Sequence, residues 1–101
     1  MVKDVDLTRK SDKNFRNIMD RMQGRVIHSI NRAKERYGVE MTEHDYFKLI
    51  EQIVSYEAEY LRPARSPGSF MYRVRFNGLS MLAIYEPKYA MICTFLSWEM
   101  T

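Results

Sequence analysis

A row of basic side chains is the feature of this sequence that points most clearly to chemistry. Its members are separated by four, three, four and four positions: Arg21, Arg25, His28, Arg32 and Arg36. In a helix that turns about 100° per residue, this spacing places them on one face. Guanidinium groups bind phosphate and carboxylate oxygens, and an imidazole exchanges a proton near neutral pH. The row therefore predicts a surface for an anionic partner, with His28 as a candidate general acid or base.

A second group of arginines follows later in the chain. Arg73 and Arg75 alternate with apolar residues, so they should project from one face of a strand and could bracket a phosphate. Arg62 and Arg65 fall in the segment RPARSPGS, whose prolines and glycine predict a loop. These four arginines are expected to contact an anionic partner together with the helical row.

Charge is unevenly distributed between two neighbouring segments of the chain. Residues 38–60 contain six acids and one lysine, whereas residues 61–85 contain four arginines and no acid. The net charge is only +3, with an isoelectric point near 9.1. Such segregation predicts a dipolar molecule with one cationic face.

Other reaction chemistries have little support in the sequence. The single cysteine, Cys93, excludes an internal disulfide and a cysteine-rich zinc site, and it is interpreted as a small apolar strand residue. The two histidines, His28 and His44, are too far apart in sequence to suggest a metal site. A glycine-rich phosphate loop is also missing, so no metal or cofactor is expected.

The size and composition fit one globular domain. The chain has 101 residues, of which 46% are hydrophobic, enough for one modest core. Residues 1–10 are predicted to form a flexible charged tail, and residues 11–101 a single domain. No apolar run is long enough for a transmembrane helix, and the charged amino terminus lacks a signal-peptide core. A cytoplasmic protein without membrane contact is the expectation.

A first helix should extend from a cap at Ser11 or Asp12 to Tyr37, with Gly38 as its C-terminal cap. Apolar residues at helical spacing form its core-facing stripe: Phe15, Met19, Met22, Val26, Ile30, Ala33 and Tyr37.

A second helix should begin after Thr42, which forms a capping box with Asp45. It should end by Leu61, because the following residue precedes a proline. Phe47 and Val54 widen its apolar face, which predicts that this helix is flanked on two sides.

From residue 70 onward the apolar period changes to two. Asn77-Gly78 predicts a two-residue hairpin, which fixes its pairs: Phe76 with Leu79, Val74 with Met81 and Tyr72 with Ala83. A turn over residues 86–89 and a third strand over residues 90–97 should follow. Regular pairing of that strand would bury Ile92, Thr94 and Leu96 and place Met91, Cys93 and Phe95 beside the arginines.

The expected fold is therefore α+β, with two N-terminal helices packed on a three-stranded antiparallel β-meander. The helices would cover one face of the sheet. Because the other face is partly apolar, it should be covered by a ligand or by another chain, and a homodimer is expected.

Several short segments resemble the small microbial ribonuclease toxins of the RelE-like and barnase–colicin group. They are His28 and Arg32 in the form H-x3-R, Tyr72-Arg73-Val74-Arg75, and the closing ICTFLS with Thr94 or Ser97. The resemblance spans about residues 25–97. It implies an antiparallel sheet that binds RNA. The acidic second helix departs from the usual basic character of that group.

Two functions are compatible with these features. The first is a small RNA-binding protein with a ribonuclease-toxin-like fold, whose candidate reaction is metal-independent RNA cleavage. Arg73 and Arg75 would then bind the scissile phosphate and His28 would transfer the proton. The alternative is a non-catalytic inhibitor or adaptor, of the type that phages and mobile elements encode, which binds an acidic protein surface. Strong salt dependence of binding favours nucleic acid.

Overall fold

The computed structural model describes residues 21–100 and confirms an α+β fold with an antiparallel sheet of four strands instead of three. The strands are arranged in the sheet in chain order, β1-β2-β3-β4. The elements are a helix over residues 21–37, α2 (Glu43–Val54), β1 (Glu59–Pro63), β2 (Phe70–Phe76), β3 (Leu79–Glu86), β4 (Met91–Leu96) and a short 3-10 turn, η1 (Trp98–Met100). The predicted tail over residues 1–10 and the predicted start of the first helix lie outside the described residues.

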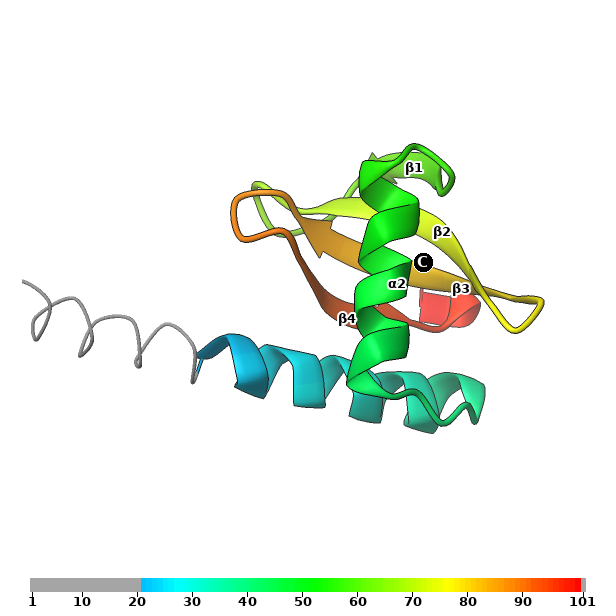
Figure 1. Cartoon of the computed structure of the whole chain (residues 1–101). Helices are drawn as coiled ribbons and strands as arrows, with labels where there is room; N and C mark the ends of the chain where they lie inside the picture. The colour runs from blue at the N-terminus through cyan, green and yellow to red at the C-terminus, as the bar shows by residue number, and fades with distance from the viewer. Residues whose placement is uncertain (1–20, 101) are drawn as a thin grey trace, which may run out of the picture.

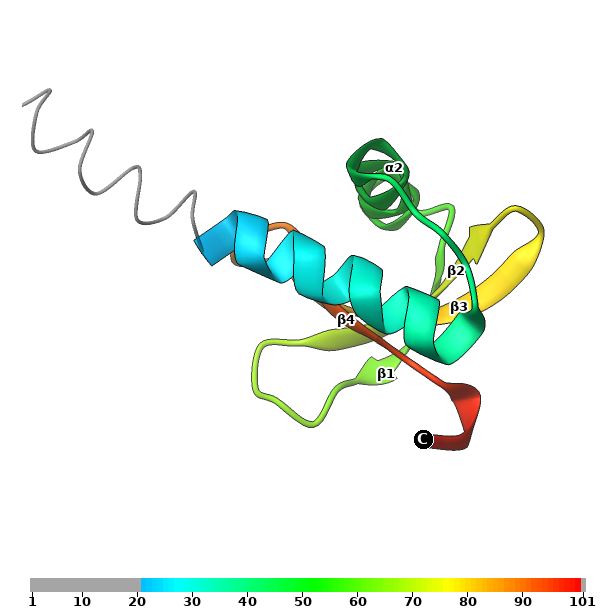
Figure 2. The same ribbon diagram turned by 90° about the horizontal axis from the view of Figure 1, so that it is seen from below.

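The two helices form one layer on one face of the sheet (Figure 1). Viewed from below, the helix over residues 21–37, hereafter the N-terminal helix, runs beside β4, and α2 lies next to it (Figure 2). The main core lies between these layers, and its fully buried side chains include Ala33, Tyr46, Val74, Met81, Ile92 and Phe95. Of the helices within residues 21–100, none is long and apolar enough to cross a membrane.

Local sequence signals correctly predict two helix caps, Gly38 and Thr42. Gly38 has a φ of 68°, and its N–H donates to the carbonyl of Lys34 at 2.9 Å, which closes the N-terminal helix. At the start of α2, Asp45 N–H donates to Thr42 Oγ1 at 3.1 Å, and Thr42 N–H donates to Asp45 Oδ2 at 2.9 Å. The hydrogen bond that the carboxylate accepts from Thr42 N–H favours its ionised form and, with a smaller contribution from the Thr42 side chain, lowers the pKa of Asp45.

The predicted end of the second helix is wrong. α2 stops at Val54, where Ser55 N–H and Oγ both bond to the carbonyl of Glu51, and Tyr56 turns the chain with a φ of 65°. The residues after this turn form β1, which pairs with β2. Pairing with β2 gives the residues of β1 the backbone hydrogen bonds that they would have made within a longer helix.

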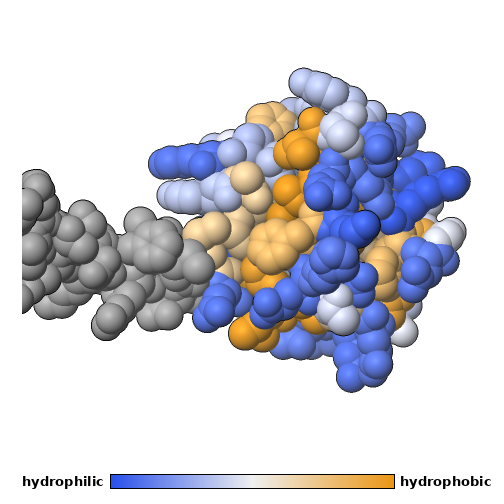
Figure 3. Space-filling model, in the orientation of Figure 1, coloured by the Kyte–Doolittle hydropathy of each residue, from blue (hydrophilic) through white to orange (hydrophobic). Residues whose placement is uncertain are grey.

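Within residues 21–100, no element covers the second side of α2 that the sequence predicts to be flanked. Phe47 and Val54 remain about half exposed on the described surface. Figure 3 shows apolar atoms on the surface beside α2.

The hairpin between β2 and β3 has the predicted register. Asn77 and Gly78 have φ values of 50° and 80°, as a type I′ turn requires. Phe76 pairs with Leu79, and the predicted pairs further along the hairpin are also present: Val74 with Met81 and Tyr72 with Ala83.

The predicted register of the last strand is wrong beyond Ile92. Tyr85 pairs with Ile92 but its neighbour Ile84 pairs with Thr94, so Cys93 is an extra residue that forms a β-bulge. After the bulge, each residue of β4 points to the sheet face opposite to the one predicted. Phe95 is completely buried in the main core, whereas Thr94 and Leu96 lie on the helix-free face. Met91 is also in the main core instead of beside the arginines.

Side chains from both helices hold the backbone at the bulge. The hydroxyl of Tyr46 accepts a hydrogen bond from Ile92 N–H at 2.9 Å and donates to its carbonyl at 2.7 Å. Ser29 Oγ donates to the same carbonyl at 2.8 Å. Because Tyr46 is deeply buried, its pKa is raised well above the usual value. These bonds give the backbone of Ile92, in the edge strand β4, hydrogen-bond partners from the helix layer.

Further along β4, two more side chains of the N-terminal helix bind the strand. Arg36 Nη1 donates to the carbonyl of Phe95 at 2.7 Å. Tyr37 donates its hydroxyl proton to the carbonyl of Leu96 and accepts from Leu82 N–H at 3.0 Å. The N-terminal helix thus covers the edge of the sheet formed by β4.

Candidate nucleic-acid interface

The helix-free face of the sheet contains the candidate site. It has a small apolar cluster of its own, formed by Met71, Leu82 and Ile84, with partly buried side chains packed around it. A hollow of about 560 Å³ lies over part of this cluster. Its lining residues come from all four strands, the β1–β2 loop and η1: Arg62, Pro63, Ala64, Arg65, Ser66, Ser69, Met71, Ile84, Glu86, Cys93, Thr94, Leu96 and Met100. The hollow therefore combines an apolar floor with polar groups at its margin.

Arg62 and Arg65 provide the cationic margin of this hollow. Arg62 lies in β1, where the sequence predicts a loop, and its Nε donates to the Met71 sulfur at 3.3 Å. Arg65 lies in the loop between β1 and β2, as predicted, and is exposed. Ser66 from the same loop and Thr94 from β4 add hydroxyl groups. These groups are suited to phosphate and ribose oxygens.

Arg73 and Arg75 lie on the same face, as the alternation predicts, but acidic residues accompany them. Arg73 forms an ion pair with Glu59 at 3.3 Å, and its guanidinium lies 5.2 Å from the centre of the Trp98 ring. The two arginines, Glu59 and Glu57 line a smaller hollow of about 330 Å³. The exposed ion pair is weak enough for a phosphate to compete with it.

The backbone of Arg75 is fixed by a side chain of α2. Gln52 Nε2 donates to the carbonyl of Arg75 at 2.8 Å, and Arg75 N–H donates to Gln52 Oε1 at 3.0 Å. The amide of Gln52 therefore takes the place of a neighbouring strand at this point of β2. This leaves the guanidinium of Arg75 exposed next to Arg73 on the helix-free face.

The helical row of basic residues is divided between structural and exposed positions. Arg25 forms an ion pair with Glu86 at 2.6 Å and lies 5.1 Å from the centre of the Tyr89 ring. The hydrogen bond to Glu86 raises the pKa of Arg25 further. Arg32 pairs with Glu35 at 2.6 Å, and Arg36 binds β4 as described above. Arg21 and His28 are exposed.

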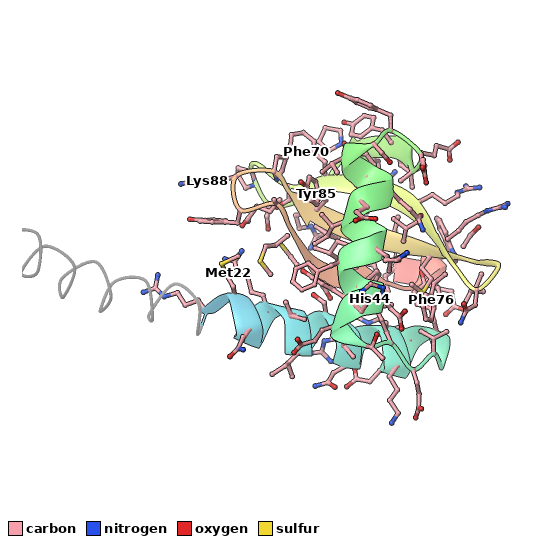
Figure 4. All side chains as sticks on the ribbon, viewed as in Figure 1. Met22, His44, Phe70, Phe76, Tyr85 and Lys88 are labelled. Atoms are coloured by element: carbon pink, nitrogen blue, oxygen red, sulfur yellow. The ribbon has the colours of Figure 1, made fainter. Side chains whose placement is uncertain are left out.

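The structure does not bring His28 together with Arg73 and Arg75. Val26 and Ala33 bury the N-terminal helix against the main core, so His28 lies on the helix side of the sheet. Both strand arginines project from the opposite face. A single chain therefore does not assemble the predicted grouping of an imidazole and two guanidiniums. His44 is exposed in the first turn of α2, also on the helix side (Figure 4).

Sequence reasoning misses two polar groups that line the larger hollow. The sequence predicts a turn at Glu86, but this residue is the last of β3 and its carboxylate pairs with Arg25. The sequence predicts Thr94 in the core, and the bulge at Cys93 turns it to the hollow. Burial and, to a smaller extent, the charge of Glu86 raise the pKa of the Cys93 thiol. A raised pKa disfavours the thiolate, as expected for a residue that packs instead of reacting.

Within residues 21–100, no group of three or more histidine, cysteine or acidic side chains is placed to hold a metal ion. The arrangement on the helix-free face offers guanidiniums, hydroxyls and an apolar floor, which suits binding of a phosphate-bearing molecule. Comparisons of the chain with protein-family models, with curated proteins and with solved structures gave no match.

Proposed function

We propose that the protein binds single-stranded RNA across the helix-free face of its sheet. The observation that carries this proposal is the position of four arginines on that face: Arg62 and Arg65 at the larger hollow, and Arg73 and Arg75 at the smaller one. Guanidinium groups spaced along a surface follow a phosphate backbone, and the apolar floor can accommodate unstacked bases. In an A-form duplex the bases stay stacked and cannot reach the apolar floor, so a duplex would use only the arginines.

Cleavage of the bound RNA is the candidate reaction of this surface. His28 lies on the other side of the sheet, so proton transfer would have to use groups at the hollow itself. Glu86 offers a carboxylate and Thr94 a hydroxyl group among the lining residues. The arginines would stabilise the charge that develops on the phosphate.

The proposal is tested by titrating a fluorescently labelled single-stranded RNA at several salt concentrations. The logarithm of the binding constant should fall linearly with the logarithm of the salt concentration. In the double variant Arg62→Gln/Arg65→Gln, this slope should become shallower by about 0.7 for each phosphate that is no longer bound. Arg32→Gln is the matched control, because Arg32 is paired with Glu35 on the N-terminal helix. Equal slopes for all three proteins would contradict the proposal.

The same mixtures report on cleavage and on the alternative function. RNA products that accumulate in the presence of a chelator would establish metal-independent cleavage. If RNA does not bind, a pull-down from nuclease-treated lysate tests the alternative. Stoichiometric, salt-tolerant capture of one acidic protein would then favour an inhibitor or adaptor.

A further inference from the structure

An apolar patch on the helix side of the molecule is only partly covered within residues 21–100. We define the patch as Met22 from the N-terminal helix, Phe47 and Val54 from α2, Tyr60 from β1 and Phe70 from β2. Phe47, Val54 and Tyr60 are 49%, 54% and 49% exposed. Figure 3 shows apolar atoms gathered beside α2 and reaching the start of the described chain. A contiguous apolar surface of this kind usually marks an interaction site.

The floor of the patch is a row of aromatic rings on the sheet. The ring of Tyr60 lies 6.2 Å from that of Phe70 and 5.4 Å from that of Tyr72. Tyr72 in turn lies 6.0 Å from Tyr85. In Figure 4, Phe70 and Tyr85 lie beside α2 and Met22 lies below them on the N-terminal helix. The patch is therefore a rigid apolar surface between a helix and a sheet, a shape that suits an amphipathic helix.

The sequence before residue 21 contains a matching apolar stripe. Phe15 and Met19 precede Met22 by seven and three positions, so in a helix all three share one face. Neither glycine nor proline occurs between residues 11 and 23 that would reverse the chain. A straight helix would carry Phe15 about 10 Å beyond Met22 along the axis, away from the chain's own patch. Phe15 and Met19 would then need cover from another molecule.

We propose that residues 11–20 of a second copy of this chain occupy the apolar patch. Phe15 and Met19 of one copy would pack against Phe47 and Val54 of the other, and two-fold symmetry would form the same interaction twice. This surface lies on the opposite side of the sheet from the four arginines, so the dimer leaves the helix-free face of both copies open. The inference is independent of the proposed function.

Light scattering of the full chain over a wide concentration range tests the inference, and a dimer is expected. The double variant Phe15→Ser/Met19→Ser removes the apolar side chains that would bind the patch. The double variant Phe47→Ser/Val54→Ser removes the part of the patch that they would contact. Each double variant should weaken dimerisation more than about a hundredfold, because apolar burial is abolished at both symmetric sites. Leu79→Ser is the matched control, since Leu79 is 39% exposed at the distant hairpin and should leave the dimer unchanged.

Mixing the two double variants gives a sharper test. The heterodimer keeps one intact interaction, between the unaltered segment of one chain and the unaltered patch of the other. The mixture should therefore associate more tightly than either variant alone. A monomeric wild-type protein, a dimer that resists both double variants, or a dimer that only the patch variant weakens would each overturn the inference. Circular dichroism of every variant verifies that the fold is retained.

Discussion

The two faces of the sheet are formed by the same strands but differ in burial and in charge. On the helix-covered face, Ile92 and Phe95 are completely buried, and polar side chains of the helices bind the backbone of β4. On the helix-free face, three buried apolar residues are surrounded by arginines and a hollow. The side chains of the helix-covered face stabilise the fold, whereas the helix-free face carries charged groups that are not needed to stabilise it. Substitutions on the two faces should therefore have different consequences.

The largest difference is expected between two neighbouring residues of β4. Phe95→Ala should destabilise the protein by about 3–5 kcal/mol, because it leaves a cavity in the main core. Leu96→Ala, on the free face and only partly buried, should cost about 1–2 kcal/mol. Urea unfolding measures both values. The reverse order would mean that β4 pairs regularly, without a bulge at Cys93.

A smaller effect should come from one hydroxyl group. Tyr46→Phe keeps the ring but leaves the N–H and carbonyl of Ile92 without that partner, at a cost of about 1–3 kcal/mol. Tyr60→Phe is the control, because Tyr60 is half exposed at the other edge of the sheet. Equal thermal stability of the two variants would show that the covered face does not depend on this hydrogen bond.

The two glycines Gly78 and Gly24 should respond in opposite directions. Gly78→Val forces a β-branched residue into the left-handed region at φ 80° and should cost about 1–3 kcal/mol. Gly24→Ala lies in the N-terminal helix, where an added Cβ meets nothing within 4 Å, and should stabilise by up to about 1 kcal/mol. Differential scanning fluorimetry reports both shifts. An unchanged melting temperature in Gly78→Val would refute the turn assignment that fixes both faces.

The smallest effect concerns the thiol on the free face. Because the pKa of Cys93 is raised, its alkylation by iodoacetamide at pH 8 should be several-fold slower in the folded chain than in urea. The raised pKa of Cys93 also means that its protonated thiol stabilises the folded chain at pH values below the ordinary thiol pKa. This stabilisation is lost as the pH rises through the higher pKa of the folded state. Equal rates in the folded and unfolded chain would contradict the raised pKa.

Features encoded by neighbouring residues could be predicted from the sequence, whereas features that depend on distant partners could not. The capping box at Thr42 and the turn at Asn77-Gly78 require only local geometry, and both are present. β1 escapes prediction because its five residues directly follow a helical pattern and become a strand only by pairing with β2. Nothing in the alternation of β4 reveals the bulge, which the hydroxyls of Tyr46 and Ser29 support from the two helices.

The candidate site shows the same division. Arg73 and Arg75 share a face because a strand alternates, and the sequence contains that information. The position of Thr94 depends on the bulge, and that of Arg62 depends on β1, so neither could be assigned correctly. The basic residues around His28 do lie on one helix, but Arg25 binds Glu86 and Arg36 binds β4.

The hydrogen bonds between the N-terminal helix and β4 have a consequence for how the chain folds during synthesis. Ser29 and Arg36 bind partners that are 63 and 59 residues later in the sequence. A ribosome therefore releases the helix long before the strand that it covers. Interactions of such separation slow folding, because a long loop must close before they form. The nascent chain should gain protease resistance only after β4 has left the exit tunnel, in one late step.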